Sequence, residues 1–328
     1  MQRSRVCSLK ACAVETTQRQ GILYILAAVT GYAFLPTLVK QIQAAGLPPL
    51  DIATWRFVFA TLIIWPLIAL RSQRASHAPL PRLRLLLLGI MMAGAALTAF
   101  YGLERLPAST LIVLFYTYPT MVAVISLFLG ERLPLQAWLA LTLTLVGVVL
   151  TVPDFGMSLQ AATAEGGSPL VEGVALALMN ALLVAVYFVL NNRVLRGHTG
   201  LAQASAWVIT GALLTMLAVT LLRREVTLPA DPSTWLYLLA LAGVSTVMPI
   251  FCLTFGIQKL GASKAAIMGT IEPVLTILIA AVVLGERMLP EQLLGGLFVL
   301  LSVVLLQVPL RFIVARGKRK PVVGEAVQ

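Results

Sequence analysis

Long apolar segments separated by short polar breaks follow one another along most of the chain. Between residues 21 and 310 each segment is about 20 residues long, which as a helix crosses a hydrocarbon core of about 30 Å. The alternation of apolar and polar positions typical of barrel strands is missing, so we expect helices. The pattern predicts an all-α polytopic membrane protein with ten transmembrane helices, at residues 21–40, 52–70, 84–102, 107–129, 135–152, 171–191, 201–222, 235–256, 263–284 and 291–310.

The two halves of this pattern repeat each other. GLERLPASTLIVLFYTYP at 102–119 aligns with GIQKLGASKAAIMGTIEP at 256–273, so that Pro119 falls on Pro273, and LGER follows in each half. Because polar and helix-breaking residues coincide, an internal duplication explains the match better than shared hydrophobicity. Each half carries five predicted spans, an odd number, so the second half must be inverted relative to the first. Inverted repeats are a recurrent plan of secondary transporters, with the substrate site near the midplane between the halves.

The repeat predicts a division of the chain into consecutive parts. The segment that joins the halves is polar and glycine-rich and lacks Lys and Arg, as suits an external loop. The parts are an N-terminal cytoplasmic tail (1–20), a first five-helix repeat (21–153), an external linker (154–170), a second five-helix repeat (171–309) and a basic C-terminal tail (310–328).

Composition excludes a water-soluble globule. The 328 residues are 59% hydrophobic and 11% charged, with a mean hydropathy of +0.94, which leaves too little polar surface to cover a soluble protein. Cys7, Cys12 and Cys252 are too few and too scattered for a disulfide framework.

The positive charge follows membrane topology. The net charge is +11, yet of the 24 Lys and Arg residues few fall on the side opposite the N-terminus. That side receives only Lys40, Arg105, Arg223, Arg224 and Arg287. By the positive-inside rule we expect both termini in the cytoplasm, in the cell (plasma or inner) membrane, with basic residues contacting anionic lipids rather than nucleic acid.

The two-half layout and the paired motifs resemble one known family. In each half, Tyr118-Pro119 or Glu272-Pro273 precedes a hydrophobic run that ends in Gly-Glu-Arg. This signature is similar to that of the EamA-type transporters of the drug/metabolite transporter superfamily, over about residues 21–309. The resemblance implies transport of a small metabolite by alternating access.

Glu272 is the acid that the pattern places inside a span. A charge there costs about 2.5–3.5 kcal/mol on insertion scales, so it should face protein or a water-filled cavity, or be protonated. Two interpretations stay open: a site for a substrate amine or a proton, and a carboxyl that only hydrogen-bonds a neighbouring helix. The aligned residue in the first half is Tyr118, so the halves should present different chemistry to one cavity.

The prolines and Arg56 are the predicted gating or structural residues. Pro119 and Pro273 each remove an intrahelical hydrogen bond, which produces either a hinge or a static kink. Arg56 lies near a membrane interface, where it can snorkel and contact Asp51, and we favour a structural or gating role for it.

Other polar residues at membrane depth complete the predicted cavity, which spans 1, 3, 4, 6, 8 and 9 should form. Tyr116 and Tyr118 would point about 200° apart on one helix, and we choose Tyr118 by analogy with Glu272. The remaining candidates are Tyr32, Thr98, Tyr101, Asn180, Tyr187, Thr254 and Thr270.

The Gly-Glu-Arg motifs have a structural explanation. A glycine ends the preceding helix without a Cβ penalty, and a glutamate suits the positive start of the next helix. We therefore interpret them as turns at the membrane surface. Their residues are Gly130 and Glu131 in the first half and Gly285 and Glu286 in the second.

These observations favour a secondary transporter, such as an exporter of an amino acid, an amine or a drug-like compound. No phosphate-binding loop is present, and neither a metal nor another cofactor is expected. The alternative is a membrane-embedded enzyme or a receptor for a small lipophilic ligand. Against an enzyme, the only histidines, His77 and His198, fall in predicted loops. We expect a small-molecule substrate and a monomer or homodimer.

Overall fold

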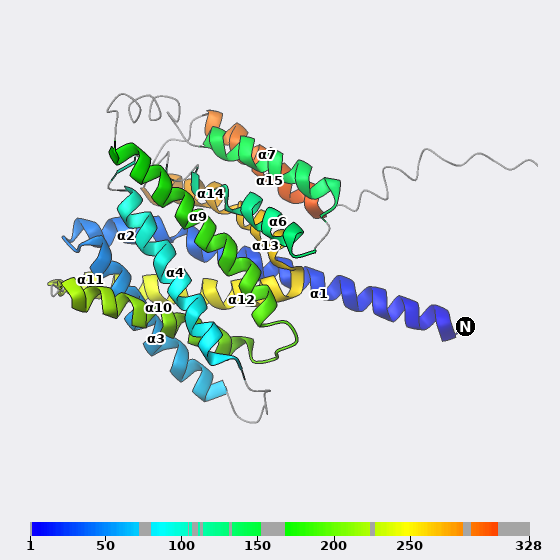
Figure 1. Ribbon diagram of the computed structural model, residues 1–328, viewed down its shortest axis with the longest axis horizontal. Helices are drawn as coiled ribbons and strands as arrows, with labels where there is room; N and C mark the ends of the chain where they lie inside the picture. Colours follow the sequence, from blue (N-terminus) through cyan, green and yellow to red (C-terminus); the bar gives the residue numbers. More distant parts are fainter. Residues whose placement is uncertain are drawn as a thin grey trace, which may run out of the picture.

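The structure is a computed structural model of the chain (Figure 1). It describes residues 2–71, 80–103, 105–106, 111, 114–130, 133–151, 168–223, 227–284 and 290–307. All regular elements within these ranges are helical, as the apolar pattern predicts.

The helices follow the order of the predicted spans. The first half contains α1 (Gln2–Ala33), α2 (Leu35–Ala44), α3 (Pro49–Arg71), α4 (Arg82–Leu103), α6 (Tyr118–Phe128) and α7 (Leu135–Thr151). The second half contains α9 (Ser168–Val194), α10 (Leu201–Arg223), α11 (Pro232–Ala242), the π-helical turn η1 (Gly243–Val247), α12 (Met248–Leu260), α13 (Ala262–Gly269), α14 (Glu272–Leu284) and α15 (Pro290–Gln307).

Several of these helices can cross a membrane. Within the described ranges, six helical segments combine sufficient length and hydropathy: Thr16–Ala44, Pro49–Leu70, Arg82–Gly102, Val171–Val194, Leu201–Arg223 and Pro232–Leu260. Three apolar helices are shorter, namely Tyr118–Phe128, Leu135–Leu150 and Leu293–Leu305. The chain is therefore a multi-pass membrane protein.

The two predicted spans that contain the paired prolines are interrupted rather than continuous. The span expected at 107–129 is divided before α6, and the span expected at 263–284 is divided between α13 and α14. Each proline occupies the second position of the later helix, where its missing N–H costs no hydrogen bond. The prolines thus begin new helices, which corrects the prediction of a kink within one helix.

The segment predicted as an N-terminal tail is helical. Helix α1 begins at Gln2, so residues 2–20 continue the first span as one helix. Figure 1 shows this helix extending away from the rest of the bundle.

Helices at equivalent places in the two halves make equivalent contacts. Helix α1 packs along α12, and α9 packs along α4. A Cβ atom on Gly21 of α1 would lie 2.7 Å from Leu260, and one on Gly173 of α9 would lie 2.6 Å from Leu106. Since Leu106 aligns with Leu260 in the repeat, the duplication is visible in the packing as well as in the sequence.

The last helices of the two halves pair with each other. Helices α7 and α15 lie side by side at the top of Figure 1. Thr144 and Ser302 share a buried hydrogen bond of 2.7 Å, and the Gln136 amide donates to the carbonyl of Leu305. Interhelical hydrogen bonds help transmembrane helices to associate, because the hydrophobic effect does not drive apolar side chains out of lipid.

Glycines bring α4 and α10 into backbone contact. A Cβ atom on Gly211 would overlap the backbone of Leu86, and one on Gly89 would overlap the backbone of Val208 and Ala212. Small residues let transmembrane helices approach until dispersion contacts between their backbones hold them together.

Gly211→Ala should therefore destabilise the folded protein. The added methyl group meets rigid backbone, and overpacking of this kind costs about 1–3 kcal/mol. Gly296→Ala is the matched control, because its Cβ would meet only Val274, at 3.5 Å. Thermal unfolding of the purified protein in detergent should show a lower midpoint for Gly211→Ala, and equal midpoints for the two variants would contradict the contact.

Candidate substrate cavity

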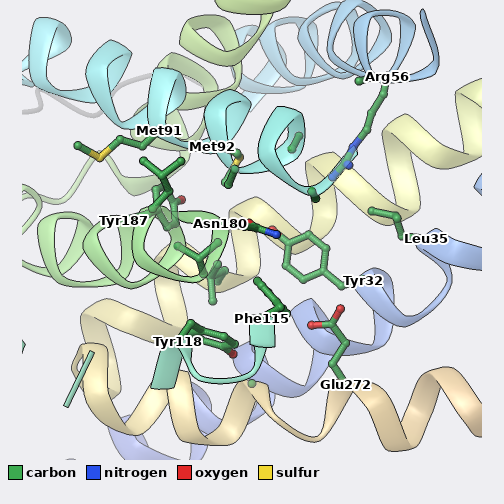
Figure 2. A pocket seen from close by; sticks show the side chains of 18 of the residues that line it. Tyr32, Leu35, Arg56, Met91, Met92, Phe115, Tyr118, Asn180, Tyr187 and Glu272 are labelled. Atoms are coloured by element: carbon green, nitrogen blue, oxygen red, sulfur yellow. The ribbon is translucent and has the colours of Figure 1, made fainter. Parts of the chain in front are cut away.

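A cavity of about 310 Å³ lies between the two halves. Helices α1, α2, α3, α4 and α6 of the first half and α9, α11, α12, α13 and α14 of the second contribute to its wall. Most of the lining is apolar, with a few polar side chains that face inward (Figure 2). The volume is at the small end of the range for ligand pockets, about 300–1,000 Å³.

The structure brings six of the predicted site residues together at this cavity. They come from α1, α3, α6, α9 and α14, which lie far apart in sequence. They are Tyr32, Arg56, Tyr118, Asn180, Tyr187 and Glu272. Arg56 was expected to serve structure or gating, and the structure adds it to the cavity wall.

Four other candidates lie outside the cavity wall. The hydroxyl groups of Thr98 and Thr254 donate to the carbonyls of Gly94 and Ile250 in their own helices. The hydroxyl of Thr270, which directly follows α13, donates to the Ile267 carbonyl of that helix. The Tyr101 hydroxyl accepts a hydrogen bond from Arg223. These groups have local partners, which a count of polar residues at membrane depth does not reveal.

Two hydrogen bonds anchor the Arg56 side chain to the π-helical turn η1. Its Nε donates to the Thr246 hydroxyl at 2.6 Å, and its Nη2 donates to the Ser245 carbonyl at 3.1 Å. That carbonyl is available because Pro249, four residues later, has no N–H to donate. The Thr246 hydroxyl in turn donates to the carbonyl of Leu241, five residues earlier. Sequence analysis missed this anchor, although Pro249 was a usable signal.

The predicted contact between Asp51 and Arg56 does not form. The Asp51 carboxylate instead accepts the backbone N–H of Thr227 at 2.9 Å. Arg56 reaches across to the second half rather than along its own helix, because η1 supplies acceptors there.

Glu272 is the first residue of α14, directly after the break in the helix. Its carboxylate lies near the positive end of that helix, which favours a negative charge. Within the part of the chain that the structure describes, the carboxylate has neither a hydrogen bond nor an ion pair. It points into the cavity (Figure 2).

Tyr118 stands at the equivalent place in the first half and has a different partner. Its hydroxyl donates to the Ala266 carbonyl of α13 at 3.2 Å. That carbonyl is released by the helix break, because the N–H of Thr270 bonds to Ile267 instead. The break in one half is thus covered by a side chain of the other half.

Aromatic rings gather beside Tyr118. Its ring centre lies 5.1 Å from that of Phe115 and 5.6 Å from that of Phe188. The Tyr116 ring is also close, at 6.2 Å, although Tyr116 is not part of the cavity wall. The prediction that the two tyrosines point apart assumed a helix, whereas residues 116 and 117 form a turn.

The two ends of the cavity have different surroundings. Val39, Ile52 and Phe100, near the adjacent ends of α2, α3 and α4, belong to its wall. Toward the other end, α6 and α13 close together, where the Ser263 hydroxyl donates to that of Ser126 at 3.0 Å. In Figure 1 this closed end lies on the side from which α1 emerges.

The turn motifs are described only in part. Gly130 has φ of 86°, a left-handed conformation that suits glycine after a helix. Glu131, Gly285 and Glu286 lie outside the described residues.

The fold and the cavity define a class of protein. Helices of two halves cross a membrane, and between them they enclose a small cavity with both acidic and basic side chains. This is the arrangement of a membrane transporter.

The chain belongs to the EamA-like transporter family. The match to that family covers residues 19–152 and again residues 171–308. It confirms the resemblance drawn from the paired motifs, and it places the chain among transporters rather than enzymes.

Characterised and uncharacterised relatives agree with this assignment. The chain is 26% identical over 234 residues to the pseudopaline exporter CntI of Pseudomonas aeruginosa, covering 71% of this chain and 77% of the relative. It is 24% identical to an uncharacterised transporter of Archaeoglobus fulgidus, covering 85% of this chain and 94% of the relative. A solved crystal structure superposes with a TM-score of 0.73 at 17% identity, covering 91% of this chain and 98% of the other, which shows the shared fold.

Gly269→Ala should disturb the contact between the halves. A Cβ atom there would lie 2.5 Å from the Tyr118 hydroxyl oxygen but 3.8 Å from the ring carbon that carries it. We therefore expect Gly269→Ala to lower the thermal unfolding midpoint, and Tyr118→Phe to recover most of the loss when the two are combined. Unfolding midpoints of the two single variants and the double variant form the cycle, and purely additive effects would refute the contact.

Proposed function

We propose that this protein is a secondary-active exporter of a small metabolite that works by alternating access. Ten transmembrane helices form two inverted repeats of five, with both termini in the cytoplasm of a cell whose plasma or inner membrane holds the protein. The observation that carries the proposal is the cavity, because it lies between duplicated halves and ends at two interrupted helices.

The pairing of helices supports inversion. Two helix pairs are equivalent, α1 with α12 and α9 with α4. In each pair, one half supplies its first span and the other half supplies its third. Exchange of the two halves leaves these pairs unchanged, as a two-fold axis between them requires, and the odd number of spans in each half sets that axis in the membrane plane. The same exchange would turn a cavity open on one side into a cavity open on the other.

The structure supports one assignment of sides. With the N-terminus in the cytoplasm, the end at Val39, Ile52 and Phe100 faces outward, and the closed end at Ser126 and Ser263 faces the cytoplasm. Export requires the closed end to open for loading. The pseudopaline exporter of Pseudomonas aeruginosa supports the direction, because it is a relative named for export.

Cysteine accessibility tests the alternation. In a chain with Cys7, Cys12 and Cys252 replaced, Val39→Cys should react with a membrane-impermeant maleimide from outside. Ser126 is 1% exposed, and cysteine is close to serine in size. Ser126→Cys should react with the maleimide from the cytoplasmic side, and only when the cavity opens to that side.

A transported solute should move the two labelling rates in opposite directions. Solutes found by a thermal-shift screen of the purified protein supply the test, since binding raises the unfolding temperature. Parallel changes at both positions, or product formation by protein in detergent, would contradict alternating access.

Glu272→Gln tests the part played by the carboxylate. The substitution keeps the shape of the side chain but removes its charge, so we expect the transport rate in proteoliposomes to fall by about tenfold or more. Glu291→Gln is the matched control, because Glu291 is exposed at the start of α15. An unchanged rate with an unchanged pH dependence would remove Glu272 from the mechanism.

A further inference from the structure

Two opposite charges face one apolar cavity. Figure 2 shows the guanidinium of Arg56 and the carboxylate of Glu272 on either side of the Tyr32 ring. Arg56 comes from α3 of the first half and Glu272 from α14 of the second. No ion pair joins these two described residues to each other.

Arg56 has donor capacity left over for a ligand. Its Nε and Nη2 are taken up by Thr246 and Ser245, whereas a guanidinium carries five N–H donors. Among the residues that the structure describes, no carboxylate lies within ion-pair distance of it. The guanidinium is therefore anchored by two hydrogen bonds, and it lines the cavity with N–H donors to spare.

Glu272 offers the complementary acceptor. It is half-buried, lies at the start of α14 and has no basic partner within the described part of the chain. A carboxylate of this kind accepts hydrogen bonds from an ammonium group, and these charge-assisted bonds are the strong ones.

The opposite signs of the two charges decide what fits. A charge in an apolar site is costly unless it is paired. A ligand with only a positive charge would leave Arg56 without a counter-charge. A ligand with only a negative charge would leave Glu272 without one. A zwitterion with its anionic group at Arg56 and its ammonium group at Glu272 neutralises both and adds no net charge.

The rest of the wall suits an apolar body. Met91 and Met92 of α4 and the rings of Phe115 and Tyr118 line the same cavity (Figure 2). Methionine side chains adapt to irregular shapes, and aromatic faces pack against apolar groups.

We propose that Arg56 and Glu272 are the two poles of a site for a small zwitterion with an apolar side chain, whose carboxylate binds Arg56 and whose ammonium group binds Glu272. Thr246 is the positioning residue for the carboxylate pole. The inference rests on the proposed function, in that it takes this cavity as the substrate site.

Matched probes test the two poles in the wild-type chain. L-phenylalanine and L-methionine carry both charges, their amides carry only the positive charge, and their N-acetyl derivatives carry only the negative charge. Binding to the purified full chain should be at least about tenfold tighter for a zwitterion than for either singly charged form, because each charged hydrogen bond lost is worth about that factor.

Substitutions then assign the poles. Arg56→Gln should remove the preference for the zwitterion over the amide and leave the preference over the N-acetyl form, and Glu272→Gln should do the opposite. Thr246→Val should weaken only the first preference, which a general loss of stability would not do. Arg84→Gln and Glu291→Gln, both exposed, and Thr61→Val, whose hydroxyl bonds within α3, should leave both preferences unchanged.

The outcomes separate this proposal from the proposed function. Equal binding of zwitterion and amide, equal binding of zwitterion and N-acetyl form, or no binding of any zwitterion would each overturn the two-pole site. Counterflow of another solute in proteoliposomes would then still support transport. Selective zwitterion binding without any counterflow would support the site and overturn the transporter.

Discussion

The arrangement of this protein depends on the need to satisfy every backbone polar group that lies away from water. In hydrocarbon a helix can be interrupted only where protein or a cavity covers the groups that the interruption releases. Here the released groups are covered by side chains from elsewhere in the fold. Tyr118 covers the carbonyl of Ala266, and Arg56 covers that of Ser245.

These covering bonds also build the cavity. The break between α13 and α14 places Glu272 at the start of a helix, and the π-helical turn η1 gives Arg56 an anchor opposite. Both irregularities come from the second half, and both partners, Tyr118 and Arg56, come from the first. The same contacts that satisfy the backbone therefore hold the two halves together around the site.

Residues that repeat in the two halves and residues that differ between the halves have different roles in the structure. The repeated features, such as the glycine contacts of α1 with α12 and of α9 with α4, form the frame. The proposed chemistry lies on residues that are not repeated. Glu272 aligns with Tyr118, so one half presents a charge where the other presents a hydroxyl that closes a helix end. A cavity between identical halves would lack this polarity.

The sequence by itself determined the helical class, the duplication and the candidates Glu272 and Tyr118, because hydrophobic length and repeated prolines are local signals. It did not determine that the prolines begin new helices, since that depends on what covers the released carbonyls. Arg56 shows the same limit: its spacing from Asp51 suggested a local pair, whereas η1 in a distant helix offered better acceptors. Only the tertiary structure separated Tyr32, Asn180 and Tyr187, at the cavity, from Thr98, Thr254 and Thr270, which bond to carbonyls three or four residues earlier in the chain. Polar groups at membrane depth look alike in sequence, and the packing of neighbouring helices decides which of them face the cavity.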